Sequence, residues 1–208
     1  MKVAIIGTGN MASGLANLFA SKNEEVIIGH RDPAKASELA EKLGKSIQGG
    51  GIDAAIGLAD VIFLALPYKA SAEVLSHSTD LAGKYVVDIS NPVSDDFSEL
   101  TLGHSTSAAE ELQRLAPPAH IVKGFNTIFA QLLSPESRQD KLLQVFIAAD
   151  NEAAKKTVFQ LAQKAGFDAV DAGPLKNSRY LEPIGAMNIQ FGYFLGWGPA
   201  AAPGWVKV

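Results

Sequence analysis

The sequence predicts an α/β fold of the Rossmann type, in which helices cover both faces of a doubly wound, mostly parallel sheet. C-terminal strands are expected to extend this sheet, and a C-terminal helix is expected to follow them. Short apolar runs alternate with amphipathic stretches along the chain, as they do in successive βαβ units. One such run, Asp60–Leu66 (DVIFLAL), is typical of a central strand buried on both faces. A length of 208 residues suits one domain with a full core.

The first 125 residues are expected to form the main part of the sheet. Pro33 suits the first turn of a helix and Gly44 marks the end of one. Strands are expected at Lys2–Ile6, Glu25–Ile28, Lys45–Gln48, Asp60–Leu66, Tyr85–Ile89 and His120–Lys123. Helices are expected at Asn10–Ser21, Pro33–Leu43, Asp53–Leu58, Ala70–His77 and Ala108–Leu115.

A C-terminal extension, about residues 126–208, follows the polar, loop-like stretch Asn91–Ser105 and the sixth strand. It carries two further apolar runs, a helix between them, and a helical stretch from Lys176 to about Leu195. These additional elements are Lys141–Ala149, Glu152–Ala165 and Asp168–Val170. Because no linker rich in Pro, Gly or Ser separates the extension, residues 1–208 are expected to form a single domain around one continuous sheet.

Composition excludes several classes of protein. The chain has no cysteine, which rules out disulfides and thiolate metal sites. Its 18 basic and 22 acidic residues leave a net charge of −4, which argues against a nucleic-acid partner. The charge-free stretch Pro183–Val206 contains three prolines, so a membrane span is not expected. The first residues lack the long apolar region of a secretory signal, and the cytoplasm is the expected location.

The strongest functional signal is the turn after the first strand, where Gly7-Thr8-Gly9-Asn10-Met11-Ala12 opens a helix. The first glycine allows a tight turn, and the second lets the backbone approach a diphosphate closely. The N–H groups at the helix N-terminus then face that anion. Because strand, turn and helix occur together, the pattern predicts a dinucleotide site rather than a glycine-rich turn alone.

The residues that end the second strand indicate which dinucleotide binds. Arg31 stands 24 positions after Gly7, where an enzyme specific for NAD usually has a carboxylate for the ribose 2′-hydroxyl. A guanidinium there can pair with a 2′-phosphate, and His30 and Lys35 can add to the same pocket. The sequence therefore favours NADP, with Asp32 serving a ribose as the alternative.

Three loops at expected strand ends are candidates for holding the reacting rings, because ligands of open α/β sheets bind beyond the carboxyl ends of the strands. They begin at Leu66, Ser90 and Lys123. Leu66, Pro67 and Tyr68 can line the nicotinamide side, while Asn91 and Asn126 offer amides that fix a ring edge.

No general acid for reducing a carbonyl is evident. The chain has no Tyr-x-x-x-Lys pattern, and no His, Asp and Glu share metal-ligand spacing, so no metal is expected. The histidines are expected at the adenine side, at a helix end, in a loop and at a strand start: His30, His77, His104 and His120. This pattern favours an acceptor that takes a hydride without acid catalysis, such as a flavin or deazaflavin ring, with the protein supplying position. No catalytic side chain is therefore assigned.

Four motifs carry a resemblance that extends over nearly the whole chain: G-T-G-N-M at Gly7–Met11, G-H-R-D-P at Gly29–Pro33, K-G-F-N-T at Lys123–Thr127 and G-P-L-K-N-S-R-Y-L-E-P at Gly173–Pro183. The chain resembles the F420-dependent NADP reductase (NADPH:F420 oxidoreductase) family. The loop Asp88–Val93 and the tail with Trp197 and Trp205 resemble its bacterial branch.

The resemblance implies a Rossmann-type sheet with C-terminal strands, a homodimer, and direct hydride exchange between NADP(H) and a planar redox ring. By position, Thr8, Asn10 and Met11 would hold the diphosphate, and His30, Arg31 and Lys35 the 2′-phosphate. Leu66, Pro67 and Tyr68 would face the nicotinamide, and Asn126 and Thr127 the second ring. The acceptor stays open among F420, a flavin, a quinone and a metal chelate.

Two other functions are compatible with the sequence: an NADP(H)-sensing binding protein, and a small carbonyl or imine reductase. The C-terminal run Ile184–Trp205 has apolar residues at helical spacing, which predicts core or dimer packing. Met187 and Phe191 are expected also to wall the acceptor cavity.

Overall fold

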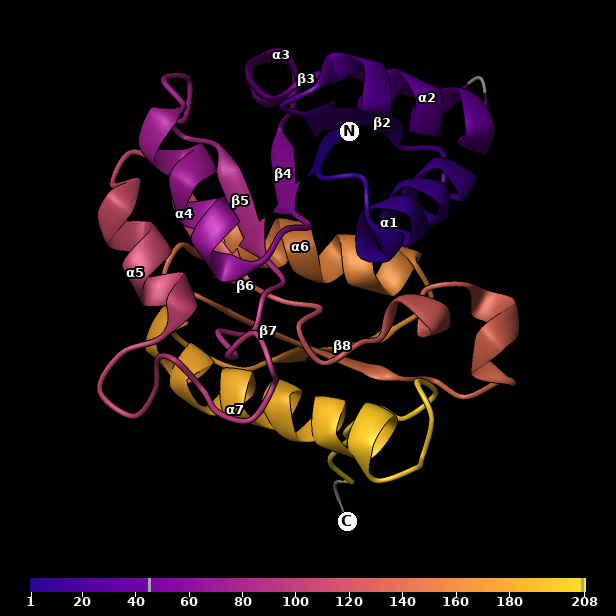
Figure 1. The fold of residues 1–208 in the computed structure, drawn as a ribbon, viewed down its shortest axis with the longest axis vertical. Helices are drawn as coiled ribbons and strands as arrows, with labels where there is room; N and C mark the ends of the chain where they lie inside the picture. Colours follow the sequence, from indigo (N-terminus) through magenta and orange to yellow (C-terminus); the bar gives the residue numbers. More distant parts are fainter. Residues whose placement is uncertain (45, 207) are drawn as a thin grey trace.

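A computed structural model describes residues 1–44, 46–206 and 208 (Figure 1). Its centre is an eight-stranded sheet in the order β3-β2-β1-β4-β5-β6-β7-β8, parallel throughout except where β7 pairs antiparallel with β6. The strands are β1 (Lys2–Ile6), β2 (Glu25–His30), β3 (Ile47–Gly51), β4 (Val61–Leu64), β5 (Tyr85–Asp88), β6 (His120–Lys123), β7 (Gln144–Ala149) and β8 (Asp168–Asp171). The expected doubly wound fold and its C-terminal extension are confirmed.

Helices cover both faces of the sheet, as apolar strands buried on both sides require. The longer ones are α1 (Asn10–Ser21), α2 (Pro33–Leu43), α3 (Ile52–Leu58), α4 (Tyr68–His77), α5 (Ala108–Leu115), α6 (Glu152–Lys164) and α7 (Ser178–Ile189). Three short 3₁₀ turns, Ala130–Leu132, Pro135–Arg138 and Leu175–Asn177, lie in the C-terminal half. Buried side chains of α1, α2 and α6 share one core, and those of α3, α4 and α5 share the other.

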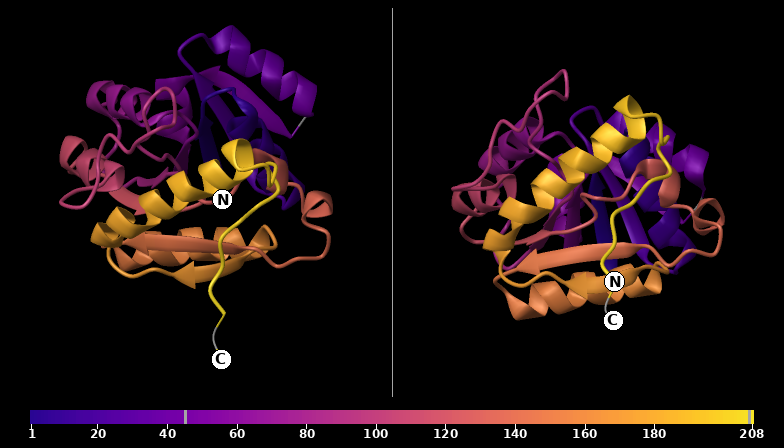
Figure 2. Two further views of the ribbon diagram at one scale, coloured as in Figure 1. Left: turned by 60° about the horizontal axis from the view of Figure 1, so that its bottom comes forward. Right: turned by 90° about the horizontal axis from the view of Figure 1, so that it is seen from below.

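Helix α7 lies on the face of β7 opposite α6 (Figure 2). Successive strand residues point to opposite faces, so Phe146 and Ala148 pack with Leu181 of α7. Val145 and Ile147 belong to the core beneath α6. The extension therefore continues the same sheet, and α7 is placed beside the ends of the central strands.

The third strand differs from the expectation. The expected range Lys45–Gln48 shifts to β3, Ile47–Gly51, which includes the three glycines; Lys45 lies outside the described residues. Gly49, Gly50 and Gly51 pair with the last residues of β2. The hydrogen bonds between strands join backbone groups and need no side chains, so three consecutive glycines can extend a strand here.

The C-terminal helix has the expected extent, but its last turn is π-helical, over Gln190–Phe194. Single π turns often occur at functional sites. None of the helices in the described part of the chain is both long and apolar enough to cross a bilayer.

Candidate functional site

The turn between β1 and α1 has the geometry of an anion cradle. Gly7 has φ +124°, and a Cβ atom there would lie 2.6 Å from the Ala65 carbonyl oxygen, so a side chain is excluded on two grounds. Gly9 precedes α1 with no side-chain cap, and nothing lies within 4 Å of its would-be Cβ. The first N–H groups of α1 are thus left for a ligand, and the space in front of them is open.

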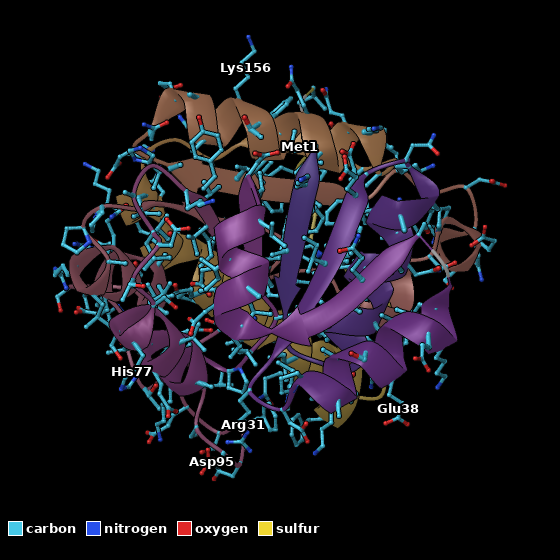
Figure 3. The ribbon with its side chains drawn as sticks, turned by 90° about the horizontal axis from the view of Figure 1, so that it is seen from above. Met1, Arg31, Glu38, His77, Asp95 and Lys156 are labelled. Carbon is cyan, nitrogen blue, oxygen red and sulfur yellow. The ribbon has the colours of Figure 1, made fainter. Side chains whose placement is uncertain are left out.

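A cavity of about 640 Å³ lies on one side of this turn, and His30 and Arg31 at the end of β2 contribute to its wall. Arg31 is exposed and has no ion-pair partner among the described residues. Nδ1 of His30 lies 3.0 Å from the Asp32 backbone nitrogen and 3.1 Å from the Asp32 carbonyl oxygen, which fixes the ring beside the end of β2. Figure 3 shows Arg31 and His77 at the edge of the molecule opposite Met1, where the parallel strands end.

Asp32, the alternative ribose ligand, is engaged elsewhere. Its Oδ1 accepts a hydrogen bond from the Ala34 N–H at 3.1 Å and caps α2, whose first residue is Pro33. Asp32 is not among the residues lining the 640 Å³ cavity, whereas Arg31 is. The charge that faces this cavity from the end of β2 is therefore positive.

A second cavity, of about 850 Å³, lies between the carboxyl edge of the sheet and α7. Leu66, just beyond β4, lines both cavities, so the two meet at this point. The strand-end loops contribute Pro67, Asn91, Asn126 and Thr127, and the β1–α1 turn contributes Gly9, Asn10 and Met11. Its aromatic lining consists of Phe97, Phe125, Phe129, Tyr193 and Phe194.

Two asparagines join the loops after β5 and β6. Asn91 Nδ2 donates to the Asn126 carbonyl oxygen at 2.8 Å, and Asn126 Nδ2 donates to Asn91 Oδ1 at 2.9 Å and to the Leu181 carbonyl oxygen at 2.8 Å. Asn126 is 7% exposed, and its Oδ1 has no hydrogen-bond partner in the structure. This buried acceptor in the cavity wall is available for a hydrogen bond from a molecule that occupies the cavity.

Helix α7 packs closely against this pair. Gly185 faces Asn91, and a Cβ atom on it would lie 2.3 Å from Asn91 Oδ1. One turn further along, Asn188 Nδ2 donates to the Thr127 carbonyl oxygen at 3.2 Å. One face of α7 therefore lines the cavity, through Gly185, Asn188 and Ile189.

The backbone at Phe125 is strained. Its φ of +60° is rare for a residue with a large side chain. Its ring is 1% exposed and makes edge contacts with Phe63 and Phe167, at centroid distances of 5.7 Å for each. The aromatic core therefore holds the unusual φ, which turns the next residue, Asn126, to the cavity.

A fully buried ionic cluster lies beneath the same strand ends. Lys123 Nζ, at the end of β6, is 2.6 Å from Asp88 Oδ2 and 2.8 Å from Glu182 Oε1, and all three side chains are 0–2% exposed. The N–H groups of Ala108 and Ala109, at the start of α5, donate to Glu182 at 2.9 and 3.2 Å. The cluster ties β5, β6, α5 and α7 together.

The pKa values within the cluster follow from burial and charge. Burial raises the pKa of Glu182, although Lys123 opposes this. Burial alone would lower the pKa of Lys123, but Asp88 and Glu182 outweigh it and hold the pKa above its usual value. Lys123 is therefore a permanent cation here.

Several predicted site residues lie elsewhere than expected. Thr8, Lys35, Tyr68 and Met187 do not line either cavity. Tyr68 packs beside the core of α3, α4 and α5, where burial, followed by the charges of the acidic side chains nearby, raises its pKa. Met187 is 45% exposed. The contacts proposed for these residues stay predictions.

Two groups of residues at the site were not predicted from the sequence. Lys123 and Glu182 lie inside the quoted motifs K-G-F-N-T and Y-L-E-P, and their charge in apolar surroundings was the available signal. Gly185 and Asn188 stand at helical spacing from Leu181, which predicts one shared face of α7. No group of three His, Asp or Glu in the described part of the chain can hold a metal ion.

An anion cradle at a β1–α1 turn, with cavities on both sides and a cation at the end of β2, defines a dinucleotide-dependent enzyme of the doubly wound class. Comparison with known proteins agrees. Residues 2–92 match the family model described as NADP oxidoreductase coenzyme F420-dependent. An F420-dependent NADP reductase of Methanocaldococcus jannaschii is 34% identical over 201 residues, covering 88% of this chain and 89% of that protein.

Other relatives extend the comparison. The metalloreductase STEAP3 of Rattus norvegicus is 35% identical over 184 residues, which are 88% of this chain and only 36% of that protein. A crystal structure of a putative F420-dependent NADP reductase from an Arthrobacter species has a TM-score of 0.83 at 27% identity, covering 92% of this chain and 94% of that one. The chain belongs to the F420-dependent NADP reductase family and is an NADP-dependent oxidoreductase, as its motifs predicted.

Proposed function

We propose that this chain binds NADP(H) across the β1–α1 turn and exchanges a hydride directly between it and a planar redox ring in the 850 Å³ cavity. The observation that carries the proposal is Arg31, a cation that lines the cavity beyond β2 and makes no ion pair within the described residues, while the neighbouring Asp32 carboxylate caps α2. A 2′-phosphate is the group that such a cation can bind and that a free carboxylate would repel.

The residues present fit NADP along its length. Gly7, Gly9 and the N–H groups of Asn10 and Met11 hold the diphosphate, and Thr8 adds a hydroxyl. Arg31 holds the 2′-phosphate, supported by His30 Nε2 and by Lys35 from α2. When bound, NADPH supplies the hydride.

The second cavity orients the two rings. Leu66, Pro67 and Asn91 line it on the nicotinamide side, and Tyr68 follows in the chain. Asn126 Oδ1 is free to accept a hydrogen bond from a carboxamide NH₂. Thr127 lies on the side assigned to the acceptor, and Met187 on α7 is proposed at its margin.

The acceptor is a planar ring, F420 or a flavin. The M. jannaschii relative is named an F420-dependent reductase, which makes a deazaflavin one candidate. The described polar residues of the cavity are amides, a threonine and a tyrosine, with no carboxylic acid or imidazole to act as a proton donor. The chain accordingly contributes position and exclusion of water, which are sufficient for a hydride transfer between two held rings.

A homodimer is part of the proposal. Large apolar side chains of the C-terminal segment are 56–65% exposed: Tyr193, Phe194, Leu195, Trp197 and Trp205. A patch of this kind is typical of a surface that a partner covers. Light scattering coupled to size exclusion is expected to give twice the chain mass of 21.9 kDa. A monomeric mass at micromolar concentration would remove the dimer from the proposal.

The test is the affinity of Arg31→Ala for both cofactors, measured by titration calorimetry. A charge-assisted contact is worth about 1.5–3 kcal/mol, so NADPH binding is expected to weaken about 10- to 100-fold while NADH binding changes little. Lys42→Ala, which removes a cation at the other end of α2, is the matched control and is expected to leave the ratio unchanged. An unchanged NADPH/NADH ratio in Arg31→Ala contradicts the proposed pocket.

Turnover distinguishes the enzyme from an NADP(H) sensor. Oxidation of NADPH is followed at steady state with F420, FMN, riboflavin and a quinone as acceptors. We expect oxidation with at least one of them. Tight NADPH binding without oxidation by any acceptor would favour the sensing role.

A further inference from the structure

The buried ionic cluster and the two asparagines of the cavity wall are connected through the backbone at two places. The first connection is the loop after β5. Lys123 Nζ donates to the Ser90 carbonyl oxygen at 2.8 Å, and the Ser90 N–H donates to Asp88 Oδ1 at 2.9 Å. Ser90 immediately precedes Asn91, so the cluster holds the backbone from which the Asn91 side chain projects.

The second connection runs through α7. Asn126 Nδ2 donates to the Leu181 carbonyl oxygen at 2.8 Å, and the next residue in the chain is Glu182 of the cluster. Glu182 Oε1 in turn lies 2.8 Å from Lys123 Nζ. Side-chain contacts and chain bonds thereby close one ring, which runs through Lys123, Ser90, Asn91, Asn126, Leu181 and Glu182.

The hydrogen bonds of this ring leave one orientation for each amide. A carbonyl oxygen can only accept, so the Asn91 group that faces the Asn126 carbonyl oxygen at 2.8 Å is its NH₂. Asn91 Oδ1 then faces Asn126, whose own NH₂ donates to it and to the Leu181 carbonyl oxygen. Asn126 Oδ1 is left as a buried acceptor without a donor among the described residues, and Asn126 lines the 850 Å³ cavity.

The cluster itself has no group to offer a ligand. The three N–H groups of Lys123 are taken by Asp88, Glu182 and the Ser90 carbonyl oxygen. The three charged side chains are 0–2% exposed, and none of them lines either cavity. Well-packed apolar side chains can replace a buried ionic group at little cost in stability, so what such a group can provide in addition is a fixed geometry.

We propose that Lys123 and Glu182 are positioning residues for the Asn126 amide, and that through it they set the place of the nicotinamide carboxamide in the 850 Å³ cavity. The inference deepens the proposed function and rests on its NADP(H) site. Asn126 Oδ1 accepts a hydrogen bond from the carboxamide NH₂. The cluster keeps the two strand-end loops and α7 in the one arrangement that points this oxygen at the ring, because hydrogen bonds between charges are strong where water is excluded.

Glu182→Gln tests the connection. Three donors converge on the Glu182 carboxylate, Lys123 Nζ and two N–H groups at the start of α5, and an amide presents only one oxygen to them. We expect the variant to bind NADPH about three- to tenfold more weakly. 2′-Phospho-ADP-ribose, which lacks the nicotinamide and its carboxamide, is expected to keep its wild-type affinity. Titration calorimetry gives both dissociation constants without any acceptor.

Asn126→Ala supplies the direct comparison, since it removes the amide and leaves the ionic cluster in place. It is expected to weaken NADPH binding about three- to tenfold and to leave 2′-phospho-ADP-ribose binding unchanged. Because Glu182 acts through Asn126, Glu182→Gln/Asn126→Ala is expected to lose no more NADPH affinity than Asn126→Ala alone. Glu182→Asp, which keeps the charge on a shorter side chain, provides the same cycle if Glu182→Gln does not fold.

Glu24→Gln is the matched control. Glu24 is also a buried carboxylate between two cations, the N-terminal ammonium at 3.0 Å and Lys164. Figure 3 shows Met1, its partner, at the edge of the molecule opposite Arg31, so this ion pair is remote from the strand ends that hold the asparagines. The control is expected to lower Tm as Glu182→Gln does and to change neither dissociation constant.

Unchanged NADPH affinity in Glu182→Gln, an equal loss for NADPH and 2′-phospho-ADP-ribose, or losses that add in the double variant would overturn the positioning role. A selective loss for NADPH, without NADPH oxidation by any acceptor in the wild type, would confirm the positioning role and contradict the proposed hydride transfer. If the wild type bound neither ligand, the proposed function and this inference would both be wrong.

Discussion

The buried ionic cluster makes a quantitative prediction about stability. In Lys123→Met, a side chain of similar length replaces the ammonium, and the Asp88 and Glu182 carboxylates stay behind at 0–2% exposure. Removing one partner of a buried ion pair typically costs about 3–5 kcal/mol, because the remaining charge has neither water nor a counter-ion. The magnitude then depends on which contacts the two carboxylates keep.

Both carboxylates retain backbone donors. Asp88 Oδ1 accepts from the Ser90 N–H at 2.9 Å, and Glu182 keeps its two N–H donors at the start of α5. We therefore expect the lower part of the range, about 3 kcal/mol. For a domain of this size that corresponds to a fall in Tm of roughly 6–12 °C.

Urea unfolding followed by far-UV circular dichroism measures the loss. The control is Lys155→Met, since Lys155 also contacts two carboxylates, Glu152 at 3.0 Å and Asp171 at 3.4 Å, but theirs are 81% and 55% exposed. Lys155 itself is buried, but the two carboxylates that the control leaves behind are solvated, so a loss of only about 0–1 kcal/mol is expected.

The pH dependence provides a second readout. Burial already raises the pKa of Glu182, and loss of the Lys123 charge raises it further. A raised carboxyl pKa means that the folded state binds a proton more tightly than the unfolded state does. The stabilisation from this proton is complete at low pH and is lost as pH rises through the folded-state pKa. The deficit of Lys123→Met relative to wild type is therefore expected to be smaller near about pH 5 than near about pH 7.5. A loss equal to that of Lys155→Met, or a deficit independent of pH, would refute the reasoning.

Two glycine substitutions test the cavities separately. Gly185→Ala places a Cβ atom 2.3 Å from Asn91 Oδ1, so it is expected to destabilise the fold by about 1–3 kcal/mol and to raise the KM for the acceptor. Gly50→Ala is the control: its Cβ atom meets open space, and the KM for the acceptor is expected to stay unchanged. Gly7→Ala is expected to weaken NADPH binding at least about tenfold in calorimetry, because both φ and the Ala65 carbonyl oxygen oppose a side chain; wild-type affinity would contradict the role of this turn.

Local signals predicted most of the elements. α1, α2 and α5 have the expected bounds because caps and apolar periodicity act within a few residues. Ser107, for example, caps α5 with its own hydroxyl. The bounds of β3 were not predicted, because three glycines carry no side-chain pattern and become part of a strand only through pairing with β2.

The site was predicted in part for the same reason. The β1–α1 turn and Arg31 depend on short stretches of backbone: Gly7 has a positive φ and Arg31 lines the 640 Å³ cavity, while their contacts with a cofactor stay predictions. Tyr68 was expected at the nicotinamide, but α4 begins at that residue and directs it toward the neighbouring core. The direction of a side chain depends on where its helix packs, which the sequence of the loop does not specify.

The sequence alone determined the doubly wound class, the dinucleotide turn, the cation after the second strand and the family, because each depends on residues close together in the chain. Only the tertiary structure brought Lys123 to Glu182, Gly185 to Asn91 and Phe97 to Phe194. The residues in these contacts are 59 to 97 positions apart in the chain. They meet because β7 pairs antiparallel with β6, and α7 then lies beside the ends of the central strands. Contacts across such separations arise from how whole elements pack, and for that reason the 850 Å³ cavity emerges only in three dimensions.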